Sequence, residues 1–257
     1  MQALLLDNTA VDEVMKFYKT NAEDEVLYPR NPDWIKEHLG DDFFLTGILT
    51  GEGEELIAVA WMAKLKNFVY FTVENEKLFI RNDGSYAYSG GWYIRPDYRG
   101  MGMFKLLAAT VNLFWFTKIN KNESVPLWGR MVGQKDADGS PLFWNRVGER
   151  VTGLPYHELL ALPFGTMEQV IFDSWPKDPI PLTCIPQDIL RQTLGKTHES
   201  LTGPLNQFIR WGCIEVTDRF VPTSLNRFHV TTKNSISDPE KFFYQALSKV
   251  LNSISAA

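Results

Sequence analysis

Apolar and polar positions along the chain follow two periods, one typical of strands and one typical of helices. Before residue 100, helix signals predict helices at about 9–20 and 32–39. Aromatic or β-branched runs predict strands at 43–50, 56–65, 68–73, 77–80 and 85–94. Turn residues separate these strands, so we expect an antiparallel meander that leads through a helix at about 101–119 into one parallel crossover. The pattern predicts a mixed α/β (α+β) fold whose mostly antiparallel sheet is flanked by helices.

The second half of the chain continues these signals. A strand is expected at 125–132, followed by a short helix that opens at Ser140-Pro141 and stops at Gly148. The remaining elements are expected as a strand at 168–175, helices at 186–194, 204–211 and 239–253, and strands at 214–220 and 227–232. We divide the chain into a core, residues 1–160, and a C-terminal extension, residues 161–257, that packs on the core as part of the same fold unit and completes the active site.

One strand-turn-helix segment carries the clearest chemistry. Its strand ends in an aromatic run, its turn holds an arginine and two glycines, and a helix begins just after them. The first turn of a helix has unpaired N–H groups and partial positive charge, glycines let a ligand approach the backbone, and arginine suits phosphate oxygens. We therefore expect a pyrophosphate site at the turn made of Arg99, Gly100, Met101, Gly102 and Met103. The strand residues before it, Trp92, Tyr93 and Ile94, are expected to bind another part of the same cofactor. The alternative is an ordinary strand-to-helix turn, and the pattern is neither a dinucleotide fingerprint nor a Walker A loop.

The run Arg99-Gly100-Met101-Gly102-Met103-Phe104 resembles the Arg-x-x-Gly-x-Gly/Ala motif of the GNAT acyltransferase superfamily. The resemblance implies that this turn binds the pyrophosphate of coenzyme A, with an acyl-CoA as co-substrate. Two positions depart from the pattern. Phe104 stands where Gly or Ala is usual, and Trp144 stands where many members have the tyrosine that protonates the leaving thiolate. Because indole is no general acid at neutral pH, a second hypothesis is an acyl-CoA-binding or regulatory protein without catalytic activity.

A more specific resemblance joins the segments YIRPDYR, GSPLFWNRVGER, FDSWPKDPIP, LGKTHES and the run to Trp211-Gly212. Over residues 77–225 these are similar to arginine N-succinyltransferase, a GNAT-related family. The resemblance implies an N-acyltransferase that moves a succinyl or other acyl group from an acyl-CoA to the amine of arginine or a related small amine. It also implies that His198 donates a proton and that Trp92 lies at the thioester. A third hypothesis is acylation of a protein or peptide amine.

His198 stands out without the resemblance as well. It lies in a polar stretch between two helix signals, and imidazole exchanges protons near neutral pH, where a departing thiolate gains from a nearby acid. The alternative is a surface residue that caps a helix. His229 is expected to be buried in a strand, and Cys213, after a glycine, is expected to be buried rather than nucleophilic. No spacing among the histidines predicts a zinc site, so no metal is expected.

Composition and charge limit the classes of partner that the protein is expected to bind. The 257 residues are 44% hydrophobic and carry a net charge of −5, which fits a globular protein and argues against nucleic acid or an anionic membrane as a main partner. No signal peptide pattern or membrane-length apolar run is evident, and two cysteines predict no disulfide framework, so we expect a cytoplasmic protein. The expected partners are a small-molecule amine and an acyl-CoA, and a homo-oligomer is possible. Candidate contacts for a cationic amine, if they are not merely solvated charges, are Glu199, Glu215 and Asp218.

Overall fold

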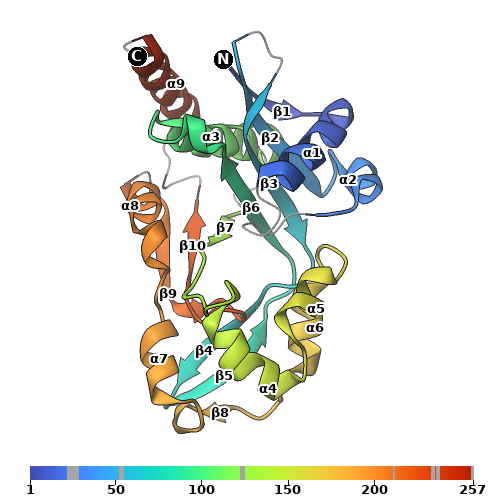
Figure 1. Ribbon diagram of the computed structural model, residues 1–257, viewed down its shortest axis with the longest axis vertical. Coiled ribbons are helices and arrows are strands. Elements are labelled where there is room, and N and C mark those ends of the chain that lie inside the picture. Colours follow the sequence, from blue (N-terminus) through green and yellow to red (C-terminus); the bar gives the residue numbers. More distant parts are fainter. Residues whose placement is uncertain are drawn as a thin grey trace. The chain divides into compact units, whose positions relative to one another are not determined.

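The computed structural model describes residues 1–21, 29–51, 55–121, 125–210, 212–232, 235 and 238–255 (Figure 1). It contains two compact units that interleave along the chain. Unit 1 comprises Met1–Lys64, Ala87–Leu127 and Thr232–Ala257, and unit 2 comprises Leu65–Tyr86 and Trp128–Thr231. The division expected from the sequence, 1–160 and 161–257, stays a prediction, and the compact units follow packing rather than chain order.

Unit 1 holds a sheet with the strand order β1-β2-β3-β6. Its strands are β1 (Gln2–Leu6), β2 (Phe43–Leu49), β3 (Leu56–Leu65) and β6 (Tyr86–Ile94), and its helices are α1 (Val11–Asn21), α2 (Pro32–His38), α3 (Met103–Phe114) and α9 (Pro239–Ser255). The pairs β1/β2 and β2/β3 are antiparallel, which confirms the expected pairing of the second and third strands. Strand β1 was not expected, because its apolar run is short and its partner lies more than thirty positions away along the chain. The sequence also predicts a hairpin turn at 51–53 and a helix cap at Ser237. Residues 52 and 53 of that turn, Trp211 and Ser237 lie outside the described residues.

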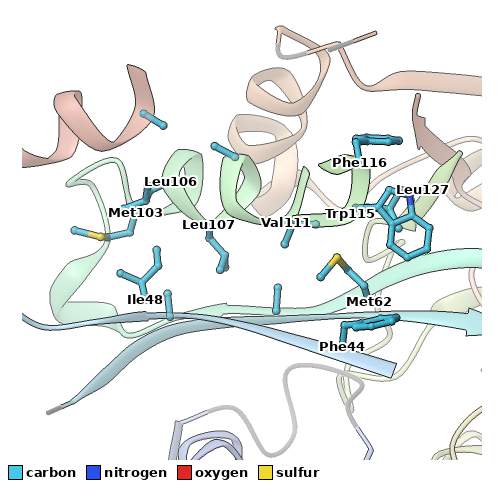
Figure 2. Packing of buried hydrophobic residues seen from close by; sticks show 14 of the residues in the cluster. Phe44, Ile48, Met62, Met103, Leu106, Leu107, Val111, Trp115, Phe116 and Leu127 are labelled. Atoms are coloured by element: carbon cyan, nitrogen blue, oxygen red, sulfur yellow. The ribbon is translucent and has the colours of Figure 1, made fainter. Parts of the chain in front are cut away.

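The core of unit 1 lies between α3 and one face of β2 and β3 (Figure 2). Figure 2 shows Ile48 and Met62 pointing from the strands toward Leu107 and Val111 of the helix. Val250 of α9 joins the same cluster, so α9 packs beside α3. Burying each such side chain contributes on the order of 2 kcal/mol, and this packing fixes where the N-terminal end of α3 lies.

The opposite face of this sheet is aromatic. The ring of Trp61 lies 5.9 Å from that of Phe43 and 5.2 Å from that of Tyr88, measured between centroids. Trp34 of α2 adds an edge contact to Phe43 at 5.5 Å. Because both faces are covered, β2 and β3 are nearly continuous apolar runs instead of alternating ones.

Unit 2 holds strands in the order β7-β10-β9-β4-β5-β8. These strands are β4 (Val69–Glu74), β5 (Lys77–Asn82), β7 (Leu127–Arg130), β8 (Ile180–Pro181), β9 (Ile214–Phe220) and β10 (Arg227–Thr231), and the helices are α4 (Glu149–Thr152), α5 (Tyr156–Ala161), α6 (Met167–Ser174), α7 (Gln187–Thr193) and α8 (Thr202–Arg210). The strands β4 and β5 pair antiparallel, as expected for the meander, and β9 pairs antiparallel with β10. The sheet and its flanking helices confirm the predicted mixed α/β fold with mostly antiparallel strands.

Two expectations for unit 2 were wrong. A strand was expected at 168–175, but residues 167–174 form helix α6. The buried Met167, Ile171 and Trp175 recur every four residues, whereas the apolar run at 170–172 suggested a strand. The short helix does not stop at Gly148. It passes through a π-helical turn at Trp144–Gly148 into α4 and ends at Gly153, where φ is +73°. Among the described residues, no helix combines the length and apolar character needed to cross a bilayer.

Candidate active site

Strand β6 has a glycine in the left-handed region directly before the candidate cofactor residues. Gly91 has a φ of +61° inside the strand, which is typical of a β-bulge. A Cβ at this position would lie 2.4 Å from atoms of the Trp61 ring and 2.5 Å from the Tyr18 hydroxyl, so only glycine fits. The Tyr18 hydroxyl donates a hydrogen bond of 2.6 Å to the Gly91 carbonyl. The positive φ of Gly91 and this bond fix the backbone that leads into Trp92, Tyr93 and Ile94.

The turn between β6 and α3 is shaped by two glycines. Gly100 and Gly102 adopt φ values of +83° and +84°, and no other described atom lies within 4 Å of the place that a Cβ would take at Gly100. Gly102 is the N-cap of α3, offers no side chain to the N–H groups of the first helical turn, and is followed by no acidic residue in that turn. The partial positive charge of the helix end is therefore uncompensated by side chains within α3, which suits an anion.

The two arginines of this turn, Arg95 and Arg99, differ in the groups that their guanidinium ions contact. Arg95 forms ion pairs with Asp97, at 2.6 Å, and with Glu55. Its hydrogen bonds to these two carboxylates, the one to Asp97 first, raise the pKa of the Arg95 guanidinium above its usual value. Arg99 donates from Nε to the carbonyl of Ile94 at 3.0 Å, and its guanidinium lies 5.2 Å from the centroid of the Tyr93 ring. No carboxylate of the described residues forms an ion pair with Arg99. Its charge is thus the one in this turn that a phosphate can pair with.

Phe104, which departs from the GNAT pattern, packs against the strand. Its ring centroid lies 5.9 Å from that of Trp92, and both side chains are half-buried. On another side of the turn, a Cβ at Gly102 would lie 3.4 Å from Val250 of α9. The aromatic side chain is therefore accommodated beside Trp92.

His198 lies in unit 2, in the segment between α7 and α8. Its backbone N–H donates to the carbonyl of Val132 at 2.9 Å. Its Nδ1 lies 2.7 Å from the Ser200 hydroxyl and accepts from the Ser200 backbone N–H at 3.3 Å. The ring therefore caps the short 3-10 turn Glu199–Leu201, as the capping alternative expects. Because a backbone N–H can only donate, Nδ1 is the acceptor and the neutral ring carries its proton on Nε2.

Trp144, which stands where many GNAT members have a catalytic tyrosine, is structural here. Its side chain is fully buried, and its indole N–H donates to the carbonyl of Leu154 at 2.8 Å. The same ring lies against Gly148, where a Cβ would meet it at 2.5 Å. This tryptophan holds the helical turn together and supplies no acid.

The other titratable candidates are buried, paired or exposed to solvent. Burial raises the pKa of the Cys213 thiol to about 11, so it stays protonated, and His229 is buried in β10 as expected. Glu215 pairs with Arg227 at 3.3 Å. Glu199 and Asp218 are exposed. Among the residues that the structure describes, no group of three or more His, Cys, Asp or Glu side chains is placed to hold a metal ion.

Sequence reasoning missed the residues that support the site. Tyr18 and Trp61, which surround Gly91, are far from it along the chain. The available signal was the pair Gly90-Gly91 inside a strand, because adjacent glycines there mark a bulge or a close approach. The residues that lie close to these glycines, Tyr18 and Trp61, are identified only by the tertiary structure.

Comparisons with known proteins give a family and a fold for the chain. The family model of the arginine N-succinyltransferase beta subunit matches residues 69–214, more than half of the 257-residue chain. The solved structure of subunit AI of the arginine/ornithine succinyltransferase from Pseudomonas aeruginosa has a TM-score of 0.66 at 13% identity, over 95% of this chain and 78% of that one. A variant of the spermidine N-acetyltransferase SpeG from Vibrio cholerae has a TM-score of 0.42 at 9% identity, over 96% of this chain and 99% of that one. A comparison with curated protein sequences gives no match.

The fold and the family match define the class: the chain is an acyl-CoA-dependent N-acyltransferase of the GNAT type. Within that class, it belongs to the arginine N-succinyltransferase beta subunit family. This confirms the resemblance drawn from the sequence. The matched range contains both the Arg99–Met103 turn and His198.

Proposed function

We propose that the protein transfers an acyl group, succinyl or another, from its coenzyme A thioester to the amine of arginine or a related small amine. The observation that carries the proposal is the family match over residues 69–214. The first turn of α3 supports it, because Gly102 caps the helix without a side chain and leaves the N–H groups to an anion.

The cofactor residues have distinct proposed roles. The backbone of Gly100, Met101, Gly102 and Met103 binds the pyrophosphate of coenzyme A, and Arg99 adds a charge-assisted contact. Strand residues Trp92, Tyr93 and Ile94 lie along the acyl-pantetheine arm. Support comes from the open face at Gly100 and from the absence of a described carboxylate paired with Arg99.

In the proposed reaction, a neutral amine attacks the thioester carbonyl directly. Backbone N–H groups near Trp92 stabilise the developing oxyanion. As the C–N bond forms and the C–S bond breaks, Nε2 of His198 gives its proton to the departing sulfur. The amine's own proton passes through solvent to Nδ1, so the ring is neutral before and after the step. The Ser200 N–H that faces Nδ1 supports this tautomer of the imidazole.

The test is release of free thiol. Succinyl-CoA and acetyl-CoA are each incubated with arginine, with ornithine and with a short peptide bearing a free amine, and products are identified by mass spectrometry. We expect thiol release with a small amine and a matching N-acyl product. Acylation of the peptide alone would make a protein or peptide amine the acceptor. No thiol release with any pair, together with no calorimetric binding of coenzyme A, would contradict the proposal.

A further inference from the structure

The turn between β9 and β10, residues Val221–Asn226, is buried throughout, although turns that join strands normally lie at the surface. Two backbone bonds close it: the N–H of Val221 donates to the Asn226 carbonyl and the N–H of Leu225 donates to the Val221 carbonyl, both at 2.8 Å. Leu225 has a φ of +57°, which is uncommon for a residue other than glycine. A strained conformation of this kind persists only where the surrounding contacts determine it.

The contacts that the turn makes go to two other segments of unit 2. The side-chain amide of Asn226 donates to the carbonyl of Met131 at 2.9 Å, and the carbonyl of Leu225 accepts from the N–H of Gly195 at 2.9 Å. The Ser224 hydroxyl donates to Oδ1 of Asn226 at 2.5 Å and so fixes which end of the amide faces Met131. A Cβ at Gly133 would lie 2.5 Å from Cβ of Ser224, so the 131–133 segment runs directly against the turn.

The same two segments hold His198. Gly133 and Thr197 form an antiparallel bridge, and the N–H of His198 donates to the carbonyl of Val132 at 2.9 Å. The side chain of Gln134 adds a bond from Nε2 to the Thr197 carbonyl at 2.9 Å. The position of the His198 backbone is therefore set by residues 131–134, and these in turn are tied to the Val221–Asn226 turn.

We propose that Asn226 is a positioning residue for His198, acting through Met131 and the bridge at Gly133. This inference rests on the proposed role of His198 as proton donor. Asn226 is fully buried, and its amide makes the one side-chain bond between the described residues of the turn and the carbonyl of Met131. A carboxylate at this position cannot donate, so it would face the Met131 carbonyl with two acceptors and displace the 131–134 segment.

The experiment compares Asn226→Asp with Asn120→Asp. Asn120 is also buried, and it makes the same kind of bond, from its side-chain amide to the Val125 carbonyl at 2.9 Å, but in unit 1. The readouts are kcat and KM for thiol release and the NMR signals of the His198 ring, which are assigned by their loss in His198→Gln. Asn226→Asp is expected to lower kcat about tenfold or more at nearly unchanged KM for the acyl-CoA and to shift the His198 signals. Asn120→Asp is expected to do neither beyond its effect on the folded fraction.

A milder variant covers the case in which Asn226→Asp does not fold. Ser224→Ala keeps Asn226 and removes only the hydroxyl that orients its amide, so a smaller loss of kcat and a shift of the same signals are expected. Unchanged His198 signals and unchanged kcat in folded Asn226→Asp or Ser224→Ala would overturn the inference. If His198→Gln itself keeps full kcat, the proton-donor role fails instead, and the His198 signals still decide whether Asn226 sets the position of the ring.

Discussion

The hydroxyl of Tyr18 donates a 2.6 Å hydrogen bond to the backbone carbonyl of Gly91, which joins α1 to β6. Tyr18 is buried, so the bond is shielded from water. The glycine that accepts it directly precedes Trp92, where the proposed thioester-binding strand residues begin. The path of that strand therefore depends on a helix from the start of the chain.

Replacing Gly91 with alanine is expected to lower the free energy of unfolding by about 3 kcal/mol, because it adds a clash with Trp61 to the cost of a positive φ. Urea unfolding measures the change. Gly84→Ala is the matched control: its φ is +80°, but no other described atom lies within 4 Å of its Cβ position, so a loss of about 1 kcal/mol is expected. Equal losses in the two variants would show that the contact with Trp61 adds nothing to the cost of the positive φ at Gly91.

Arg99→Ala is expected to weaken coenzyme A binding about tenfold, since it removes a charge-assisted contact to phosphate. Arg95→Ala serves as the control, because Glu55 and Asp97 already pair with that guanidinium. It is expected to change the Kd less than about twofold. Calorimetric titration with coenzyme A at two salt concentrations measures the Kd of Arg99→Ala and of Arg95→Ala. The assignment of Arg99 fails if both variants bind equally well.

His198→Ala is expected to lower kcat about a hundredfold or more if its ring donates the proton to the leaving sulfur. KM for the acyl-CoA should change little, because the ring is assigned no role in binding. The comparison variant is His157→Ala, whose side chain is exposed on α5. Full turnover by His198→Ala over the whole pH profile would leave the ring only its capping contact with Ser200.

The stability of the folded chain is expected to depend on pH through His229. Both ring nitrogens are buried without a hydrogen-bond partner among the described residues. Burial lowers the pKa of His229, while the charge of Glu215 raises it and that of Arg227 lowers it by smaller amounts. Below the unfolded-state value of about 6.5, the unfolded chain binds more protons than the folded one. The free energy of unfolding should therefore fall as pH drops from about 6.5 toward the folded-state pKa, by at most about 1.4 kcal/mol per pH unit, and His229 should add nothing above that window.

His229→Leu checks this pH dependence. Urea unfolding between about pH 7 and pH 5 should give a flatter profile for the variant than for the unchanged chain. His157→Gln reports the effect of removing an exposed histidine. Parallel profiles for His229→Leu and the unchanged chain would assign the acid sensitivity to other groups.

Local patterns along the chain were sufficient for most of the elements and for the turn to which cofactor binding is proposed. The run from Trp92 to Met103 was predicted correctly as strand, turn and helix, because glycine placement and helical spacing are properties of neighbouring residues. The same holds for the expected strand that contains His229 and for the burial of Cys213. The motifs also carried the family resemblance, since they keep their order and spacing along the chain.

Only the tertiary structure decided which distant segments meet. Residues 167–174 fold as a helix because Met167, Ile171 and Trp175 are buried on one side of it, and this burial overrides the strand propensity of the apolar run at 170–172. Gly91 lies against the ring of Trp61 and accepts a hydrogen bond from the hydroxyl of Tyr18. Asn226 donates to the carbonyl of Met131, 95 positions earlier in the chain. Packing and hydrogen bonding across such separations depend on chain topology, which no local period encodes.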